Sequence, residues 1–373
     1  MADLYRAVLP EVRSIEARLD RDEAQGLDTS CLRQALRELR WRFEYTADTA
    51  AARATLERVR TLAAPPAPPT AAVPDEEGSY GPCTDVWFLK LDASVDRLLA
   101  PDFEGKSPRF LDRINDPDRL DRYLESLLVS PLVEEGVDHR KELNFATAAL
   151  VRLILWKRPI NYRWDPRLET VIRRFVANWQ DPATGFFGAT YEIVGRRFRT
   201  TDLSLTFHMA RYLEGRVGYW PELIDTLIGI RDDRYPNGWL DEEGITSHNN
   251  YDVVTLFQLG WPAMRADQRQ RARAEIERLL GWCLATAIAP DGTVLARAKS
   301  ESLAESYYFT IAFLDTVGYL DPAKRFWTDH EFPEASTLKA QLQRHVRHLH
   351  QGDPMTRMAL DRLSPPRPVT VRR

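Results

Sequence analysis

The sequence predicts an all-α fold, an α/α toroid of five to six helical hairpins arranged in inner and outer helix layers. Two observations carry this prediction. Glycines recur at intervals of 55, 49, 53 and 54 residues, each in a turn between two helical stretches: Gly81, Gly136, Gly185, Gly238 and Gly292. The stretches on the two sides of these turns also differ, since one set is amphipathic and the other is apolar on most sides.

The first expected element is an N-terminal helical hairpin over residues 1–62, in which Leu32, Leu36 and Leu39 recur at helical spacing. A Pro/Ala-rich linker at residues 63–80 then breaks the periodicity. Residues 81–352 hold the five glycine-marked units, and residues 353–373 are expected to form a disordered tail. Gly26 precedes Gly81 by another 55 residues, so the N-terminal hairpin is a candidate for the sixth unit.

The units of residues 81–352 each pair one outer helix with one inner helix. The outer helices are expected at residues 111–132, 166–179, 221–232, 265–288 and 333–351. The inner helices are expected at residues 85–99, 141–156, 201–213, 250–259 and 302–319. The inner set carries few charges beyond the first turn, which indicates burial on most sides. This alternation favours two concentric layers over a flat solenoid.

Composition limits the classes of partner. The chain has 51 Lys and Arg against 55 Asp and Glu, a net charge of −4, which gives no reason to expect a nucleic-acid partner. No stretch reaches the roughly 18 apolar residues that a membrane span needs. The N-terminal residues lack the apolar core of a secretory signal. The cysteines are three and far apart, which fits neither a disulfide framework nor a zinc site. We therefore expect a cytoplasmic protein.

One segment resembles known families. Asp181-Pro-Ala-Thr-Gly-Phe-Phe-Gly188, followed by residues 200–208, is similar to the glycine-aromatic turn and inner helix of the α/α-toroid superfamily. That superfamily includes six-hairpin glycosidases, polysaccharide lyases, terpenoid cyclases and prenyltransferases. The resemblance covers roughly residues 81–350 and implies an architecture shared by several chemistries. The aspartate-rich motif of class II terpenoid cyclases and an evident prenyltransferase zinc set are both missing from the sequence.

Polar side chains occupy the first turns of the expected inner helices, where a closed ring would bring them together. They include the carboxylates of Glu142, Asp202, Asp252 and Glu305, which could act as general acid and base on a glycosidic bond. Helix capping is the alternative explanation, because such residues also bind the free N–H groups of a helix start.

Basic clusters precede several of these turns: His139-Arg140-Lys141, Arg196-Arg197-Phe198-Arg199 and Arg297-Ala298-Lys299. Cations at a helix N-terminus oppose the helix dipole, and a bound anion would remove that conflict. We therefore expect an anionic ligand, with Arg196, Arg197 and Arg199 as binding residues. The alternative is that the arginines pair with carboxylates of neighbouring units.

The densest polar segment is Thr246-Ser-His-Asn-Asn-Tyr-Asp252. β-Elimination needs a base, an acid and a group that neutralises a carboxylate, roles suited to His248, Tyr251 and either Asn249 or Asn250. This set resembles the Asn/His/Tyr sets of α/α-toroid polysaccharide lyases. The remaining candidate binding residues are His208, Tyr307 and Trp239, for which a place in the core is the alternative.

These observations lead to an expected function: an enzyme that binds a small-molecule or oligosaccharide anion in the central cavity, as a lyase or hydrolase of a uronate-type sugar. A terpenoid or prenyl-diphosphate enzyme and a non-catalytic binding scaffold are the alternatives. The sequence contains no P-loop, Rossmann glycine pattern, HExxH or EF-hand loop, so no cofactor and no metal are expected. It predicts no oligomeric state.

Overall fold

The computed structural model describes residues 1–64, 73–100, 103–158, 160–242, 244–295 and 301–364. Its helices are α1 Ala2–Ala24, α2 Ser30–Tyr45, α3 Thr49–Ala63, α4 Trp87–Leu98, α5 Pro117–Ser126, α6 Arg140–Leu155, α7 Leu168–Trp179, α8 Leu203–Tyr212, α9 Trp220–Gly229, α10 Ser247–Gly260, α11 Ala266–Trp282, α12 Leu303–Thr316, α13 Ala335–His348 and α14 Pro354–Leu363. The strands are β1 Val129–Ser130, β2 Thr190–Ile193 and β3 Arg196–Arg199. The described chain is therefore mostly helical, as the sequence predicts.

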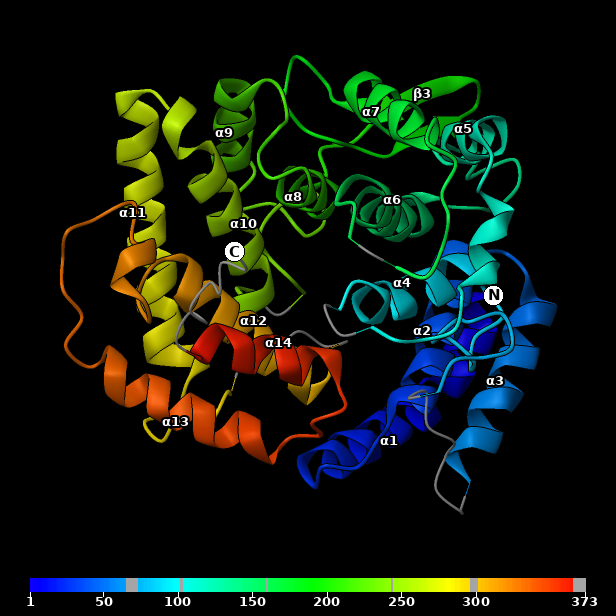
Figure 1. The fold of residues 1–373 in the computed structure, drawn as a ribbon, viewed down its shortest axis with the longest axis horizontal. Coiled ribbons are helices and arrows are strands. Elements are labelled where there is room, and N and C mark those ends of the chain that lie inside the picture. Colours follow the sequence, from blue (N-terminus) through cyan, green and yellow to red (C-terminus); the bar gives the residue numbers. More distant parts are fainter. Residues whose placement is uncertain (65–72, 101–102, 159, 243, 296–300, 365–373) are drawn as a thin grey trace, which may run out of the picture.

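The even-numbered helices from α4 to α12 form a connected series. Each of α4, α6, α8 and α10 packs against the next helix of the series, while α5, α7, α9, α11 and α13 lie on the periphery (Figure 1). These two sets match, by residue range, the helices that the sequence predicts as inner and outer. Most of their bounds agree to within a few residues. The first outer helix is shorter than expected, because α5 ends at Ser126 and a short 3-10 turn covers Arg109–Arg113.

The inner helices run parallel to one another. Near the starts of α6 and α8, Asn144 Nδ2 donates a hydrogen bond to Ser204 Oγ (2.8 Å), and near their ends Trp156 Nε1 donates to the Tyr212 carbonyl (2.8 Å). Two other helix pairs also contact each other start to start and end to end. For α4 and α6 these contacts are Phe88–Phe145 near the starts and Asp96–Arg152 near the ends. For α10 and α12 they are His248–Glu301 near the starts and Gln258–Thr316 near the ends. The N-terminal ends of these helices therefore lie at the same end of the molecule.

Helix α8 shows why the inner helices are apolar on most sides. Its Leu205 and Met209 belong to an apolar cluster shared with α4, α6 and α7. Its Leu203 and Phe207 belong to a second cluster, shared with α9 to α14. A helix that packs on both flanks needs apolar residues around most of its circumference.

The N-terminal segment differs from the expected hairpin, since residues 2–63 form three helices. The second break lies at residues 46–48, where Asp48 accepts a hydrogen bond from Ala51 N (2.9 Å) and caps α3. All three helices contact the rest of the chain, and Arg37 of α2 forms ion pairs with Asp92 of α4 and Glu305 of α12. Arg37 thus bridges the first and last helices of the inner series.

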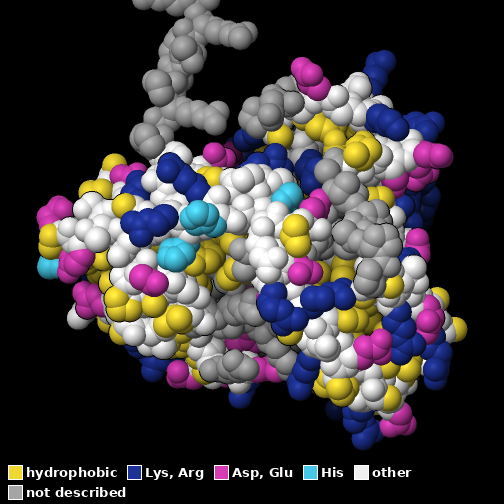
Figure 2. All heavy atoms as spheres, turned by 90° about the horizontal axis from the view of Figure 1, so that it is seen from below, with side chains coloured by type: hydrophobic (Ala, Val, Ile, Leu, Met, Phe, Trp, Pro, Cys, Tyr) yellow, Lys and Arg dark blue, Asp and Glu magenta, His cyan; other side chains and the backbone are white. Residues whose placement is uncertain are grey.

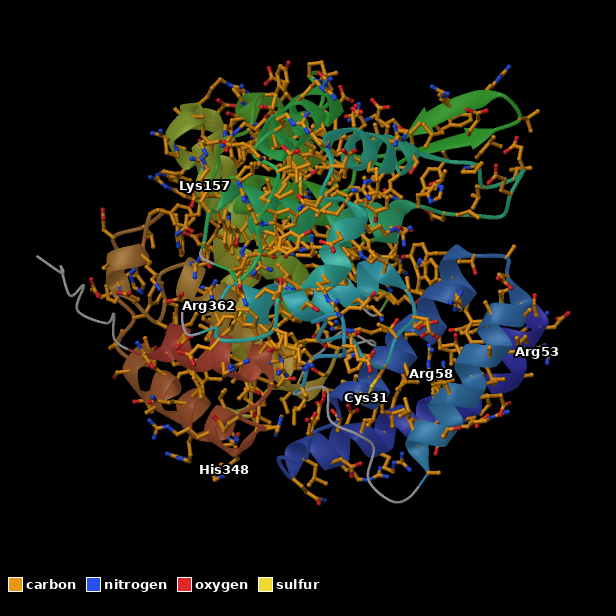
Figure 3. The ribbon with its side chains drawn as sticks, turned by 45° about the vertical axis from the view of Figure 1, so that its right-hand side comes forward. Cys31, Arg53, Arg58, Lys157, His348 and Arg362 are labelled. Atoms are coloured by element: carbon orange, nitrogen blue, oxygen red, sulfur yellow. A yellow bond between two sulfur atoms is a disulfide. The ribbon has the colours of Figure 1, made fainter. Side chains whose placement is uncertain are left out.

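A disulfide joins α2 to the segment before α4. Cys31 and Cys83 are bonded, with their Cα atoms 5.4 Å apart, and Cys283 is a buried free thiol (Figure 3). The expectation of three unpaired cysteines was therefore wrong. The two partners are 52 positions apart in the sequence, and α2 and α3, which pack against each other, lie in this stretch.

The C-terminal segment also differs from expectation, because α14 forms where a tail without structure was expected. Asp353 caps the helix by accepting from Met355 N (2.7 Å) and Thr356 N (3.2 Å), and Pro354 occupies its first turn. Ala359 and Leu363 are buried in the contact with α12 and α13. Residues 365–373 lie outside the described residues.

The small sheet was not predicted. β2 and β3 form an antiparallel hairpin that leads into α8, and β1 pairs in parallel with β2. The two-residue turn between β2 and β3 has positive φ at both Val194 (50°) and Gly195 (68°), and this conformation matches the twist of a tight hairpin. The hairpin places the expected arginine cluster on β3.

Candidate functional site

Helices α8 and α10 are buried except for a few partly exposed polar residues. On α8, every residue from Asp202 to Ala210 is buried except His208, and Arg211 and Tyr212 follow on the same face one turn later. On α10, His248 keeps 30% of its side chain exposed, while residues 249–257 are all buried. We call the polar groups on and around these faces the central site; its members discussed below are Arg37, Arg140, Asn144, Asp202, His208, Arg211, His248, Asp252, Glu301 and Glu305.

Arg140 and Asp202 form an ion pair at the N-terminal ends of α6 and α8. Arg140 Nε lies 2.5 Å from Asp202 Oδ2 and Arg140 NH2 lies 3.1 Å from Oδ1, and the Asp202 side chain is fully buried. Asp202 Oδ1 also accepts from Leu205 N (3.0 Å), which caps α8. Both alternatives weighed for these residues are thus present, capping and pairing between units, and together they hold the two helix starts in register.

His208 is held as a neutral base. Its Nδ1 lies 2.6 Å from Asn144 Oδ1, which only accepts hydrogen bonds, so Nδ1 carries the proton and Nε2 keeps its lone pair. Asn144 is fixed in this orientation because its Nδ2 donates to Ser204. Burial, together with the positive charge of Arg211, lowers the pKa of His208 to about 3.

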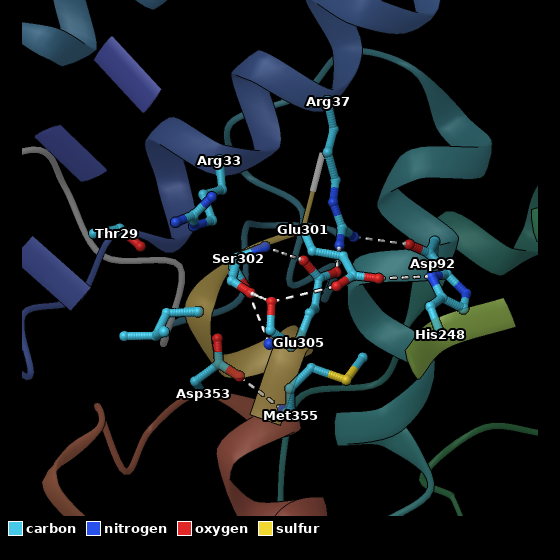
Figure 4. Close-up of polar contacts among 12 residues, drawn as sticks. Thr29, Arg33, Arg37, Asp92, His248, Glu301, Ser302, Glu305, Asp353 and Met355 are labelled. Atoms are coloured by element: carbon cyan, nitrogen blue, oxygen red, sulfur yellow. Dashed lines mark hydrogen bonds and ion pairs between the residues drawn. The ribbon is translucent and has the colours of Figure 1, made fainter. Parts of the chain in front are cut away.

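His248 is perturbed in the opposite direction. Its ring stacks on Phe309, with centroids 3.8 Å apart and planes inclined by 6°, and its Nδ1 lies 3.0 Å from Glu301 Oε1 (Figure 4). Burial acts to lower its pKa, but the hydrogen bond to Glu301 and the charge of Asp252 outweigh burial and raise the pKa to about 9. His248 is therefore a cation at neutral pH.

Asp252 is the buried carboxyl group of the central site. It is 1% exposed, and neither carboxyl oxygen has a hydrogen-bond partner in the described part of the chain. Burial raises its pKa to about 7, and the charges of His248 and Arg211 limit the rise. Asp252 therefore holds its proton to a much higher pH than an exposed aspartate does.

Glu305 closes the central site on the α12 side. It accepts from Ser302 N (2.8 Å) in a capping box and pairs with Arg37, which also lies 3.4 Å from Asp92 (Figure 4). Burial acts to raise the pKa of Glu305, but Arg37 and the cap hydrogen bonds lower it overall. Glu305 is therefore an ionised, paired carboxylate.

Two predicted binding residues lie in the core instead. Trp239 is 2% exposed, and its Nε1 donates to the Leu227 carbonyl (3.0 Å). Asn249 Nδ2 donates in turn to the Trp239 carbonyl (2.9 Å), which fixes the loop before α10. Both side chains therefore have structural partners.

Three further candidates are also held in the protein interior. Tyr251 is 1% exposed, and its hydroxyl accepts from Arg362 NH2 (3.0 Å). The Tyr307 hydroxyl accepts from Val294 N (3.4 Å). Asn250 is 2% exposed, with no hydrogen-bond partner for its Nδ2 among the described residues.

Glu142 faces away from the central site. Its carboxylate accepts from the Tyr123 hydroxyl (2.9 Å) on α5, and burial raises its pKa. Among the groups that act on this carboxylate are His139 and Arg113, which are not members of the central site. The structure thus separates Glu142 from the carboxylates of Asp202, Asp252 and Glu305.

The predicted arginines of β3 lie on an exposed hairpin. Arg197 Nε lies 3.1 Å from Glu192 Oε2 across the two strands, and Arg199 donates to the Trp179 carbonyl. Arg196 is exposed beside them. None of the three contacts His208, His248 or Asp252 in the described part of the chain. Arg297 and Lys299 of the last basic cluster lie outside the described residues.

Two arginines of the central site were missed. Arg211 follows His208 by three residues, so helical spacing from Ser204 and His208 could have identified it. Arg37 comes from α2, 268 residues before Glu305, and no local pattern connects them. The charged face in Figure 2 offers no simpler guide, because Lys and Arg side chains are interspersed there with Asp and Glu.

The core position of Trp239 leads to a testable prediction. We expect Trp239→Phe to lower the free energy of unfolding by about 1 kcal/mol, because the Leu227 carbonyl loses its donor. Urea unfolding would measure this loss. Ligand affinity should not change, and a loss of affinity without a loss of stability would instead place Trp239 in a binding site.

In the part of the chain that the structure covers, no group of three or more His, Cys, Asp or Glu side chains is placed to hold a metal ion. None of the described helices combines the length and apolar character needed to cross a lipid bilayer. Comparisons of the chain with protein-family models, curated proteins and solved structures found no match.

Proposed function

We propose that the chain is an α/α-toroid enzyme that binds a uronate-type sugar in the central site and cleaves it by acid–base catalysis. The toroid is supported by five parallel inner helices and by Arg37, which bridges α4 and α12. Six-hairpin folds of this kind supply one inner helix per unit, and α2 is the candidate for the sixth position.

The observation that carries the proposed catalysis is the opposite perturbation of His208 and Asp252. A neutral histidine with a free Nε2 is a base, and a buried carboxyl group with a pKa near 7 is an acid. Environments that shift the pKa values of a histidine and a carboxyl group apart in this way are typical of acid–base pairs in active sites. This assigns the base to His208 rather than His248, and the acid to Asp252 rather than Tyr251.

The proposed reaction is β-elimination. His208 Nε2 removes the proton α to the sugar carboxylate, the electron pair forms the C4=C5 double bond, and the C4–O bond breaks. The leaving oxygen takes its proton from Asp252. His248, as a cation, would neutralise the carboxylate and stabilise the charge that develops when the proton leaves.

Hydrolysis is less well supported, because a glycosidase needs a second available carboxylate beside its acid. Asp202 is paired with Arg140, and Glu305 is paired with Arg37. Glu301 lies against His248. These pairings leave Asp252 as the carboxyl group of the central site without a hydrogen-bond partner among the described residues.

The test is cleavage of oligouronates by the protein and by His208→Ala. We expect unsaturated products, detected by ultraviolet absorbance, and a loss of about 10²–10⁴-fold in rate on removal of the base. The control is His348→Ala, because His348 is exposed on α13 at the periphery (Figure 3). New reducing ends without unsaturation would indicate hydrolysis. If the protein cleaved no oligouronate, the proposal would be contradicted, and the non-catalytic binding scaffold would be the remaining alternative.

A further inference from the structure

Arg211 is the arginine of the central site without an acidic partner. Arg37, Arg140 and Arg152 each pair with a carboxylate, and so does Arg362 of α14. Arg211 forms no ion pair with any described carboxylate. Its surroundings are aromatic, with the guanidinium carbon 5.2–5.5 Å from ring centroids: Phe207, Tyr212 and Tyr251.

The aromatic surroundings satisfy Arg211 only in part. One of its five N–H donors has a described partner, the Tyr308 hydroxyl at 3.2 Å. Ring faces attract a cation, but they do not accept the directed hydrogen bonds of the guanidinium edge. Removing a charged group from water without a counter-charge is costly, so buried cations are ordinarily paired. The remaining donors of Arg211 are free to bind an oxyanion.

The geometry places these donors beside the proposed reaction centre. His208 and Arg211 are three residues apart on one face of α8, a rise of about 4.5 Å along the helix. The charge of Arg211 also acts on both His208 and Asp252. Arg211 lies further from the N-terminal end of the helices than His248, the other cation proposed to bind a carboxylate, which itself contacts Glu301.

We propose that Arg211 is a second anion-binding position, so that the ligand carries two acidic groups, one near His248 and one deeper in the central site at Arg211. This rests on the proposed function and names its substrate more closely. Two acidic groups in succession describe a chain of at least two uronate units, or one uronate joined to a sugar that bears an acidic ester. A planar carboxylate and a tetrahedral sulfate would both engage the same fork of donors.

The proposal makes a distinctive prediction for stability. If the guanidinium is kept for a ligand, Arg211→Met removes a half-buried charge that has no described counter-charge, and the Tm without ligand should stay the same or rise. If the guanidinium is instead a structural part of the aromatic cluster, the same variant should lower Tm by several degrees. Arg211→Lys keeps the charge but loses the fork, so it should bind anions more weakly than the parent protein.

The experiment measures thermal shifts and binding with three probes at matched ionic strength: a monouronate, a diuronate and inorganic sulfate, with chloride as the reference. We expect the diuronate to stabilise the parent protein most, and Arg211→Met to bind it at least about tenfold more weakly. Arg53→Met is the control, because Arg53 is exposed on α3 (Figure 3). Sulfate stabilisation lost in Arg211→Met would favour a sulfated ligand.

The outcomes separate the two proposals. Unchanged diuronate affinity in Arg211→Met, or a Tm several degrees lower without ligand, would overturn the second anion position. Since binding needs no turnover, Arg211-dependent binding without cleavage would support this inference while contradicting the catalytic proposal. Cleavage that depends on His208 but not on Arg211 would do the reverse.

Discussion

Replacement of Asp252 by asparagine is expected to lower kcat on oligouronates by about 10²–10⁴-fold, the usual contribution of a general acid. Asparagine keeps the size of the side chain but has no proton of suitable acidity to give to the leaving oxygen. Because Asp252 is 1% exposed without a hydrogen-bond partner among the described residues, the substitution removes no described contact. The rate loss would therefore report chemistry rather than collapse of the site.

The pH profile tests the same assignment. An acid with a pKa of about 7 gives activity that falls as pH rises through 7, and this fall should disappear in Asp252→Asn. The rise in activity that follows deprotonation of His208 lies near pH 3, and His248 loses its charge only near pH 9. A profile that still falls through pH 7 in the variant would assign that pKa to another group. Asp329→Asn, at an exposed position on another part of the chain, is the control.

Asp252 also affects stability. Its pKa is raised from 3.8 to about 7, so the folded protein holds a proton that the unfolded chain has released. The free energy of unfolding should fall by roughly 1.4 kcal/mol for each unit that the pH rises between these values, because unfolding releases that proton and a higher pH favours its release. His208 acts in the opposite sense, because its pKa is lowered and its contribution to stability rises with pH from about 3 to 6.5. In Asp252→Asn the fall in stability between about pH 3.8 and pH 7 should therefore be smaller than in the parent protein.

The second large effect is expected on stability, from Glu38→Ala. Glu38 is completely buried in α2, where it pairs with Arg42 and Arg58 and accepts from Thr84 Oγ1 (2.7 Å) and Asp85 N (3.0 Å). Its removal leaves the largely buried guanidinium of Arg42 without its carboxylate and that of Arg58 with only the exposed Asp85. Loss of one member of a buried charge network costs about 3–5 kcal/mol. Chemical denaturation of the parent and variant would measure this difference.

An exposed glutamate on the neighbouring helix provides the comparison. Glu57 pairs with Arg60 at 2.6 Å, with 69% of its side chain exposed, and Glu57→Ala should change stability by less than about 1 kcal/mol. Similar losses in both variants would show that burial does not set the strength of the Glu38 network. Figure 3 shows Arg58, one of its members, near the Cys31 disulfide.

The helices were predictable because their signal is local. The inner helix expected at residues 201–213 is observed as Leu203–Tyr212, since apolar periodicity and the Asp202 cap fix its limits. The β2–β3 hairpin was missed because its ten residues are short and largely exposed. The third N-terminal helix and α14 were also missed. Few apolar residues pack these helices against the rest of the chain, so their periodic signal is weak.

The site was predictable in position but not in the roles of its residues. Helical spacing placed Asp202 at the start of α8, His208 near the middle of α8, and His248 and Asp252 in the first half of α10. Which histidine is neutral depends on burial and on partners from other helices, such as Glu301 and Asn144. Charge states set by distant segments cannot be read from spacing along one helix.

The ion pair between Arg37 and Glu305 has a consequence for biosynthesis. Its two residues are separated by 268 positions, so the N-terminal helices emerge from the ribosome long before α12 exists to receive them. Until then, the charged side of α2 that faces α4 and α12 has only part of its final environment. Contacts of such long range form late and slow folding, because the intervening chain must first be ordered. The last helices to be synthesised thus complete the surroundings of one of the first.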